Sequence, residues 1–403
     1  MALLSVADAF RLVLADAQPL PAVDAPLTDA YGRVLAQDLA ARRSQPPAAV
    51  SAMDGYAVRA ADVAQAGARL KVVGEVAAGR PFDRAIGPGE AARIFTGGVL
   101  PAGADAVVVQ EQTTREGDAV VIGRPTRPGK NVRPEGLDFK EGEVLFARGH
   151  RLAARDLSLV AGMNHAAVPV HRRPRVATFA TGDELVPPGA TPGPGQIVYS
   201  NGFALMALFR AEGAEVIDLG IVRDRLDETV AAVRRARDLG ADVLVTTGGA
   251  SVGDHDLVQQ AFKAEGASMS FWRIAMRPGR PLMHGLVGAM HVLGLPGNPV
   301  SSYICALLFG VPLIRRLAGR TDLESEVETA ILGADLAEND ERADYLRATL
   351  ARDSQGRLVA TAFPLQDSST MGRLARADCL ILREPFEPAA AAGTPCRIVK
   401  LAL

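Results

Sequence analysis

The segment 244–256, which reads LVTTGGASVGDHD, combines the residue types that phosphate chemistry needs. An apolar run typical of a buried strand ends in a turn of small residues, which include Gly248, Gly249, Ser251 and Gly253. Such a turn before a helix lets backbone N–H groups approach an anion without a side chain in the way. Two carboxylates, Asp254 and Asp256, follow and would repel a bare phosphate unless a divalent cation lies between them. The segment therefore indicates a phosphorylated or oxyanionic ligand handled together with Mg²⁺.

A second loop, TGDEL at 181–185, places two adjacent acids after a strand predicted over 175–180. Helix N-capping explains Asp183 equally well, because acidic side chains suit a first helical turn. For Glu184 we favour a role with metal or substrate, since carboxylates crowded at one sheet edge repel one another unless a cation intervenes.

A third loop, LPGNP at 295–299, has the pattern of a helix start. Asn298 can cap the helix and Pro299 fits its first position, but the same geometry aims free N–H groups at an anion. The nearby segment FWRIAMRPGRP carries three arginines, Arg273, Arg277 and Arg280. They supply the positive charge that a multiply charged oxyanion requires, although a solvated arginine face is the alternative.

These loops belong to a β/α rhythm over 173–322. Predicted strands over 175–180, 215–219, 242–245 and 290–295 alternate with predicted helices over 201–211, 227–239 and 300–317. The alternation predicts a parallel-rich sheet with helices on both faces. Because ligands bind at the carboxyl ends of parallel strands, we expect the three loops to share one edge.

The composition is that of an ordinary globular chain. Its 403 residues predict two to four domains. A net charge of −2 excludes a general attraction to nucleic acid or anionic membranes. Three cysteines without a CxxC pair suit a reducing compartment, and the apolar run 303–312 is too short to span a bilayer. The N-terminus, with Ser5 as N-cap and Asp8 in its apolar stretch, predicts an amphipathic helix rather than a signal peptide, so we expect a cytoplasmic protein.

The rest of the sequence divides into three further domains. Residues 46–138 contain short β-type runs between Gly/Pro turns and predict a small β-rich domain. This domain is inserted in a helical and extended domain formed by 1–45 and 139–172. Five β-type runs over 323–403 predict a terminal β-barrel or sandwich.

The β-rich segment carries two candidate residues. Asp54 lies in the turn MDG, and Thr96 precedes two glycines in IFTGG. Both motifs are ordinary turn chemistry, and an aspartate in a hairpin turn is more often structural. A threonine beside two glycines could also offer a hydroxyl and N–H groups to an anion.

Taken together, the motifs resemble those of the MoeA-type molybdopterin molybdenumtransferases, whose animal relative is the gephyrin E domain. In this chain the matching motifs are SAMDGYAV, RIFTGGVLPAGADAVVVQEQ, GKNVRPEGLDF, TGDEL, TTGGASVGDHD, MRPGRP and LPGNPVSS, in the order and spacing of the family. The resemblance covers essentially the whole chain. It implies an elongated four-domain homodimer with a Mog-like molybdopterin-binding α/β domain, a β-rich domain inserted in an elongated linker domain, and a C-terminal β-barrel.

The reaction that the resemblance implies is insertion of molybdate into the dithiolene of adenylylated molybdopterin. Mg²⁺-dependent cleavage of the pyrophosphate bond accompanies it and releases AMP. The ligand carries its own sulfurs for molybdenum, so no cysteine ligands are needed from the protein. What the protein supplies is charge neutralisation and positioning for a phosphoanhydride. The implied partners are a second protomer, molybdopterin adenylyltransferase, and apo-molybdoenzymes or their chaperones, without nucleic acid or membrane.

The resemblance also assigns roles to single positions. The catalytic positions are Asp54, Thr96, Glu184 and Asp256. The substrate-binding positions are Gly248, Gly249, Ser251, Gly253, Arg277, Arg280, Pro296, Gly297, Asn298 and Pro299. The metal-binding carboxylates are Asp54, Asp138, Asp183, Glu184, Asp254 and Asp256. In the family the β-rich insert of one protomer faces the α/β domain of the other, so we expect the active site to span the dimer interface.

Two departures from the family pattern need an explanation. The family commonly carries lysines where this chain has Arg277 and Arg280, and arginine cannot release its proton, so their role would be electrostatic. Only five of the 44 basic residues are lysine, so a general preference of this chain for arginine is enough to explain both replacements. Pro134 and Leu137 interrupt a loop before Asp138 that is usually more acidic.

Two other functions compete with this enzyme. A scaffold that presents the cofactor without chemistry is disfavoured because every expected acid is present. The preceding adenylyltransferase step uses the same α/β fold, but the insert and the C-terminal domain argue against it.

Overall fold

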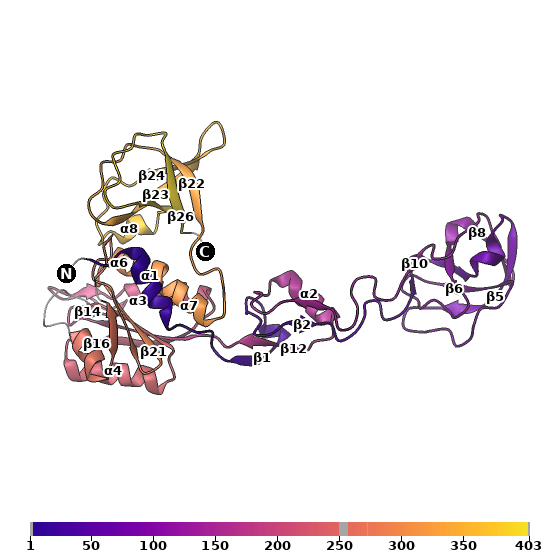
Figure 1. Ribbon diagram of the computed structural model, residues 1–403, viewed down its shortest axis with the longest axis horizontal. Helices are drawn as coiled ribbons and strands as arrows, with labels where there is room; N and C mark the ends of the chain where they lie inside the picture. The colour runs from indigo at the N-terminus through magenta and orange to yellow at the C-terminus, as the bar shows by residue number, and fades with distance from the viewer. Residues whose placement is uncertain (1–2, 250–256, 272, 402–403) are drawn as a thin grey trace. The chain divides into compact units, whose positions relative to one another are not determined.

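The computed structural model describes residues 3–249, 257–271 and 273–401 (Figure 1). By their contacts these residues form two compact units. The first unit comprises Met1–Val23 and Val170–Leu403, and the second comprises Asp24–Pro169.

A six-stranded mixed sheet forms the centre of the first unit, in the order β16-β13-β17-β21-β20-β18. The strands are β13 Arg175–Thr181, β16 Glu215–Val222, β17 Val243–Thr247, β18 Ser268–Phe271, β20 Met283–Val287 and β21 Met290–Leu295. The first four strands in this order run parallel, and β20 pairs antiparallel with both β21 and β18. The predicted parallel-rich sheet is confirmed, but strands β18 and β20 were not predicted from the sequence.

Helices cover both faces of this sheet, as expected (Figure 1). One core cluster joins the sheet to α1, α3, α6 and α7, and a second joins it to α4 and α5. Their bounds are α1 Val6–Ala15, α3 Asn201–Ala211, α4 Leu226–Asp238, α5 Leu257–Ala264, α6 Pro299–Cys305 and α7 Val311–Leu317.

The helix predicted over 300–317 contains a wider turn. A π-helical segment, η4 Ala306–Gly310, separates α6 from α7. Pro312 follows it in the first turn of α7, where its missing N–H costs little. The run Pro299–Leu317 is apolar enough to cross a membrane by length and composition, but 78% of its apolar stretch is buried within the protein. It is the core helix of the α/β domain.

The N-terminal helix α1 packs into the core of the first unit. The Ser5 hydroxyl accepts the Asp8 backbone N–H, which confirms the predicted N-cap. Ala9 and Val13 are fully buried in the same cluster as α7. The residues up to Val23 therefore belong, by contacts, to the α/β unit, whereas all of 1–45 was predicted to belong to the linker domain. The amphipathic pattern predicts a buried stripe but not the partner that covers it.

The C-terminal region is a closed five-stranded barrel, as predicted. Its strands pair in the cycle β23-β24-β22-β26-β25-β23. Their bounds are β22 Val327–Leu332, β23 Ala343–Arg352, β24 Leu358–Ala362, β25 Cys379–Arg383 and β26 Pro395–Lys400. A short strand of the α/β domain, β19 Met276–Arg277, pairs parallel with β23 and joins the two domains.

The second unit contains the β-rich insert, whose six strands have the order β7-β4-β6-β5-β9-β8. They are β4 Gly55–Val58, β5 Ala68–Val76, β6 Glu90–Ile94, β7 Ala106–Val109, β8 Thr113–Glu116 and β9 Ala119–Ile122. All of 46–138 is described, and its only helical segments are the 3₁₀ turns η2 Ala60–Val63 and η3 Gln110–Gln112. The predicted β-rich domain is confirmed. The rest of the unit includes α2 Ala154–Gly162 and short strand pairs.

Candidate functional site

Three loops meet at the carboxyl edge of the parallel strands, as the sequence predicts. Gly248 has φ +85°, and a Cβ at this position would lie 2.5 Å from the Thr181 carbonyl oxygen at the end of β13. A Cβ on Gly297, after β21, would lie 3.6 Å from the Gly248 Cα. The TGDEL, TTGG and LPGNP loops are therefore in direct contact. Gly248 must be glycine because its φ is positive and because the Thr181 carbonyl oxygen leaves no room for a Cβ.

The glycine turn continues through Gly249, which has φ +64°. A Cβ there would lie 2.5 Å from Cγ2 of Val258 on α5. The turn is thus packed between a strand end and a helix, which suits close approach of its backbone to a ligand. The next predicted residues, Ser251, Gly253, Asp254 and Asp256, lie outside the described residues.

An acidic pair lies at the same edge of the sheet as the glycine turn, after the neighbouring strands β13 and β16. The Asp183 N–H donates to Asp224 Oδ2 at 3.4 Å, and the Asp224 N–H donates to Asp183 Oδ1 at 3.3 Å. The pKa of Asp224 is raised, first by its partial burial and then by the negative charges of Asp183 and Glu184. This crowding of carboxylates matches the expectation for TGDEL. Asp224 was not among the residues predicted from the sequence.

The oxygen donors at this edge have the chemistry that Mg²⁺ prefers. Within the described ranges, however, no group of three His, Cys, Asp or Glu side chains is arranged to hold a metal ion. Asp183, Glu184 and Asp224 supply carboxylates, and the two further acids predicted from the sequence follow the glycine turn outside the described part. The metal assignments of these residues stay predictions.

The LPGNP loop starts a helix, but not in the way the sequence suggests. Asn298 occupies the N-cap position of α6, and Pro299 is in the first turn. The Asn298 side chain makes no capping bond and instead donates to Ser368 Oγ at 2.8 Å. The Val300 N–H donates to the Ser368 carbonyl at 3.1 Å. A loop of the barrel thus takes over part of the capping. On the other side of the motif, Asn201 Nδ2 donates to the Gly297 carbonyl oxygen at 2.6 Å.

The barrel loop that covers LPGNP is held by a buried arginine. Arg347 on β23 is fully buried and donates to Gln366 Oε1, the Asp367 carbonyl and Thr370 Oγ1 at 3.2, 3.0 and 2.7 Å. Its Nη2 has no hydrogen-bond partner among the described residues. Burial, followed by the nearby Arg373, lowers the pKa of Arg347. A buried guanidinium with a free N–H next to this loop is a candidate oxyanion contact.

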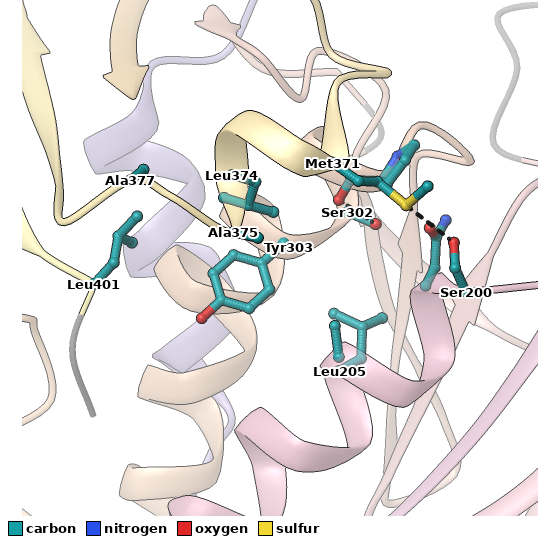
Figure 2. Close-up of a pocket in the computed structure, with 12 residues that line it drawn as sticks. Ser200, Leu205, Ser302, Tyr303, Met371, Leu374, Ala375, Ala377 and Leu401 are labelled. Carbon is teal, nitrogen blue, oxygen red and sulfur yellow. Dashed lines mark hydrogen bonds between the residues drawn. The ribbon is translucent and has the colours of Figure 1, made fainter. Parts of the chain in front are cut away.

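A pocket of about 390 Å³ opens next to the LPGNP loop, between α3, α6 and α8 Met371–Leu374 (Figure 2). Leu205, Tyr303 and Leu374 give it apolar walls. The Ser200 hydroxyl, at the start of α3, does not cap that helix but contacts Met371 Sδ at 3.3 Å. The pocket therefore lies between the α/β domain and the barrel.

Two arginines of the MRPGRP motif have different surroundings. Arg277 donates through Nε and Nη2 to both oxygens of Asp344, and through Nη1 to Asp340 Oδ2 at 3.1 Å. Its pKa is raised, chiefly by the bond to Asp344. Arg280 is exposed, and no side-chain partner is found for it in the described residues. Arg277 is thus tied to the barrel, whereas Arg280 has no carboxylate partner among the residues that the structure describes.

In the β-rich insert, the MDG and FTGG turns hold each other. The Thr96 N–H and Oγ1 both donate to Asp54 Oδ1, each at 2.7 Å. These two bonds, and then the charge of Arg93, lower the pKa of Asp54. The predicted use of FTGG N–H groups for an anion is not supported, because Gly97 and Gly98 donate to the carbonyls of Ser51 and Phe95. The turn instead fixes an ionised aspartate.

The predicted site residues are distributed over both units. Asp54, Thr96 and Asp138 belong to the second unit, and Glu184, the glycine turn and LPGNP belong to the first. Asp138 is exposed, and its backbone N–H donates to the Gln45 carbonyl at 2.9 Å.

Known families match three successive regions of this chain. They are the MoeA N-terminal region (domain I and II) over residues 4–163, the probable molybdopterin binding domain over 177–316, and the MoeA C-terminal region (domain IV) over 329–401. The molybdopterin molybdenumtransferase of Haemophilus influenzae is 34% identical over 91% of this chain and 91% of its own length. That of Bacillus subtilis is 35% identical over 88% and 84%. The chain belongs to the MoeA family of molybdopterin molybdenumtransferases.

Solved structures of the MoeA family agree with this fold. Two structures of the molybdopterin biosynthesis MoeA protein from Pyrococcus horikoshii are 30% and 27% identical, with TM-scores of 0.88 and 0.81. They cover 100% and 99% of this chain and the whole of their own. The chain is therefore an enzyme of molybdenum cofactor biosynthesis, as the resemblance of its motifs implies.

Two candidate residues near these loops, Asp224 and Arg347, were not predicted from the sequence. Asp224 stands just before α4, where an acid looks like an ordinary helix-start residue. Arg347 lies in a β-type run, where an arginine suggests a solvent-facing position. For Asp224 one signal was available in the sequence. The loop that contains it follows β16, so it begins at the same carboxyl edge of the sheet as the loop after β13.

Proposed function

We propose that this enzyme inserts molybdate into the dithiolene of adenylylated molybdopterin and cleaves the pyrophosphate bond with release of AMP. The observation that carries this proposal is the contact of Gly248 with Thr181 and Gly297, beside the Asp183–Asp224 pair. A backbone cradle for an oxyanion thus lies next to carboxylates that need a cation. That combination suits a charged phosphoanhydride.

The residues at the edge would divide the work between anion and cation. The glycine turn would accept a phosphate through backbone N–H groups. Asp183, Glu184 and Asp224, with the predicted Asp254 and Asp256, would hold Mg²⁺ through carboxylate oxygens. Bound Mg²⁺ supplies charge neutralisation for the phosphate oxygens of the leaving AMP. Arg280 and the free N–H of Arg347 would bind molybdate by charge and hydrogen bonding.

The insert would complete the site from a second protomer. Thr96 fixes one oxygen of Asp54, so the other oxygen is available for a cation or a water. In a homodimer, Asp54 of one subunit would then face Glu184 of the other. We infer a cytoplasmic reaction, whose product passes to apo-molybdoenzymes or their chaperones.

Turnover assays test the reaction directly. The full chain, given adenylylated molybdopterin, Mg²⁺ and molybdate, is expected to release AMP, and omission of either ion should reduce the rate at least ten-fold. Glu184→Gln should lose most of the activity, whereas the exposed Glu326→Gln serves as a matched control and should keep it. Tight binding of adenylylated molybdopterin without AMP release would favour a scaffold instead. Adenylylation of molybdopterin from ATP would favour the preceding step.

Mixing two inactive variants tests the dimer. Asp54→Asn and Glu184→Gln chains, combined after dissociation, should recover about a quarter of wild-type activity, because half of the dimers hold one intact site of two. No recovery, with mixed dimers demonstrated, would place both residues in one protomer's site.

A further inference from the structure

Arg93 occupies a rigid position beside the Asp54 turn. It lies on β6 opposite Tyr56 of β4, and its Cζ is 5.3 Å from the Tyr56 ring centroid and 4.9 Å from that of Phe95. Its Nη1 donates to the Gly55 carbonyl at 3.2 Å. Cation–π contacts on aromatic rings, together with this bond, hold the guanidinium in place.

The guanidinium of Arg93 forms no ion pair with a carboxylate among the described residues. None of the ion pairs found in the described chain includes Arg93, whose remaining bond goes to the neutral side chain of Gln110. Three other arginines of the insert are paired, as Arg59–Asp62, Arg69–Glu116 and Arg84–Glu90, and the remaining ones, like Arg93, are in no described ion pair. The charge of Arg93 reaches Asp54, whose pKa it lowers, but the two described bonds of its guanidinium go to neutral groups, so its remaining N–H groups can bind an anionic ligand.

Gln110 links this cation to Asp54. Its side-chain oxygen accepts from Arg93, and its backbone N–H donates to the Asp54 carbonyl at 3.0 Å. Of the five N–H groups of a guanidinium, the bonds described for Arg93 use two, so three are available. Asp54 Oδ2 takes part in no described hydrogen bond. A free carboxylate oxygen and a free guanidinium edge thus share one loop surface.

We propose that Arg93 is a further substrate-binding residue, which binds a phosphate oxygen of the nucleotide part of the substrate beside Asp54. A phosphate that carries a divalent cation presents both negative and positive charge. On this surface Arg93 can bind the phosphate oxygens and Asp54 can bind the cation. The inference rests on the proposed function, because only the adenylylated substrate brings such a phosphate to Asp54. Neither the sequence motifs nor the family resemblance assigned a role to Arg93.

Binding of AMP to the full chain tests the inference without turnover. Isothermal titration with 5′-AMP and Mg²⁺ should show at least ten-fold weaker binding for Arg93→Met, because a charge-assisted hydrogen bond is lost. Arg93→Lys should show an intermediate loss, since it keeps the charge but not the fork. Arg84→Met is the matched control: Arg84 also stacks on a ring, that of Phe82, but is paired with Glu90. It should bind AMP like the wild type.

The outcomes separate this inference from the proposed function. Wild-type AMP affinity in Arg93→Met, or an equal loss in Arg84→Met, would overturn the role of Arg93. If Arg93→Met lowers the melting temperature of the insert, the AMP affinities of Arg93→Lys and Arg84→Met are compared instead. Weaker binding by Arg93→Lys than by Arg84→Met supports the role of Arg93, and equal binding overturns it. An enzyme that releases no AMP from adenylylated molybdopterin, yet binds AMP in an Arg93-dependent way, would refute the reaction and retain the phosphate contact.

Discussion

Gly297 packs against Gly248, so that a Cβ on Gly297 would lie only 3.6 Å from the Gly248 Cα. The two glycines follow neighbouring parallel strands, β21 and β17. Their contact brings the backbone of LPGNP next to the backbone of TTGG with no side chain between them. A continuous strip of main chain at a sheet edge is the surface that a phosphate or a molybdate can approach most closely.

Gly248→Ala should disable the enzyme out of proportion to its effect on stability. A methyl group there would lie 2.5 Å from the Thr181 carbonyl oxygen, so the turn must move. Gly266→Ala is the matched control, because Gly266 also has a positive φ, +77°, but nothing lies within 4 Å of its Cβ position. Gly266→Ala should cost about 1–2 kcal/mol in free energy of unfolding from its φ alone, and Gly248→Ala should cost more because the clash adds to the same strain. AMP release should fall more than ten-fold only in Gly248→Ala, and equal activities would contradict a role for the turn.

The contact between Asn298 and Ser368 should couple the α/β domain to the barrel. The Asn298 Nδ2–Ser368 Oγ bond of 2.8 Å is accompanied by the backbone bond from Val300, which side-chain changes leave intact. A double-mutant cycle with Asn298→Ala and Ser368→Ala should give a coupling energy of about 0.5–1.5 kcal/mol in urea unfolding. Strictly additive effects would show that the side-chain bond is not formed in solution.

The strands and helices of the α/β domain could be predicted because their periodicity is strong. The helix over 201–211 and the strand over 290–295 coincide with α3 and β21. Strand β20 was missed because its apolar run is joined to β21 by the short turn at Gly288, which has φ +62°, and was not recognised as a hairpin. A hairpin inside a β/α rhythm breaks the pattern on which the prediction depends.

The site was predictable where a motif marks a loop and unpredictable where tertiary packing decides. The glycine turn and LPGNP were found from spacing alone. The partner of Asn298 could not be predicted, because Ser368 is 70 residues away in the sequence. Its bond to the Asn298 side chain replaces the local capping bond that the motif suggests. The burial of Arg347 depends on the closure of the barrel, which no local pattern encodes. Likewise, the N–H groups of Thr96, Gly97 and Gly98 donate to the Asp54 carboxylate and to the carbonyls of Ser51 and Phe95, partners that the motif alone does not reveal.

Acid should destabilise the first unit through His284. This side chain is fully buried beside His291, with 3.3 Å between Nε2 and Nδ1, and burial lowers its pKa from 6.5 to about 3. The unfolded chain binds a proton near pH 6.5 and the folded chain does not, so stability falls as pH falls below 6.5. Between pH 8 and pH 5 the loss should be about 2 kcal/mol.

His284→Gln provides the check on this pH dependence. Glutamine can keep a donor toward His291 but cannot titrate, so the slope of unfolding free energy against pH should decrease over this range. Urea unfolding at constant ionic strength measures both slopes. An unchanged slope would mean that other groups cause the acid sensitivity.

Arg277 and Arg280 should separate into a structural and a ligand-binding residue. Asp344, the partner of Arg277, has a side chain that is only 6% exposed, so Arg277→Met would leave a buried carboxylate unpaired. Because Arg277 itself is 45% exposed, the expected loss is about 1–2 kcal/mol in free energy of unfolding.

Arg280→Met, by contrast, should leave stability within about 0.5 kcal/mol, since the exposed side chain has no described partner. It should raise the molybdate concentration required for half-maximal AMP release about ten-fold, because the unbalanced charge is lost. Arg280→Lys should restore most of that affinity, since the charge rather than a proton transfer is needed there. Arg277→Met is compared directly: if it raises the required molybdate concentration as much as Arg280→Met does, without loss of stability, the Arg277–Asp344 ion pair breaks during the reaction. Arg277 would then also contact the oxyanion.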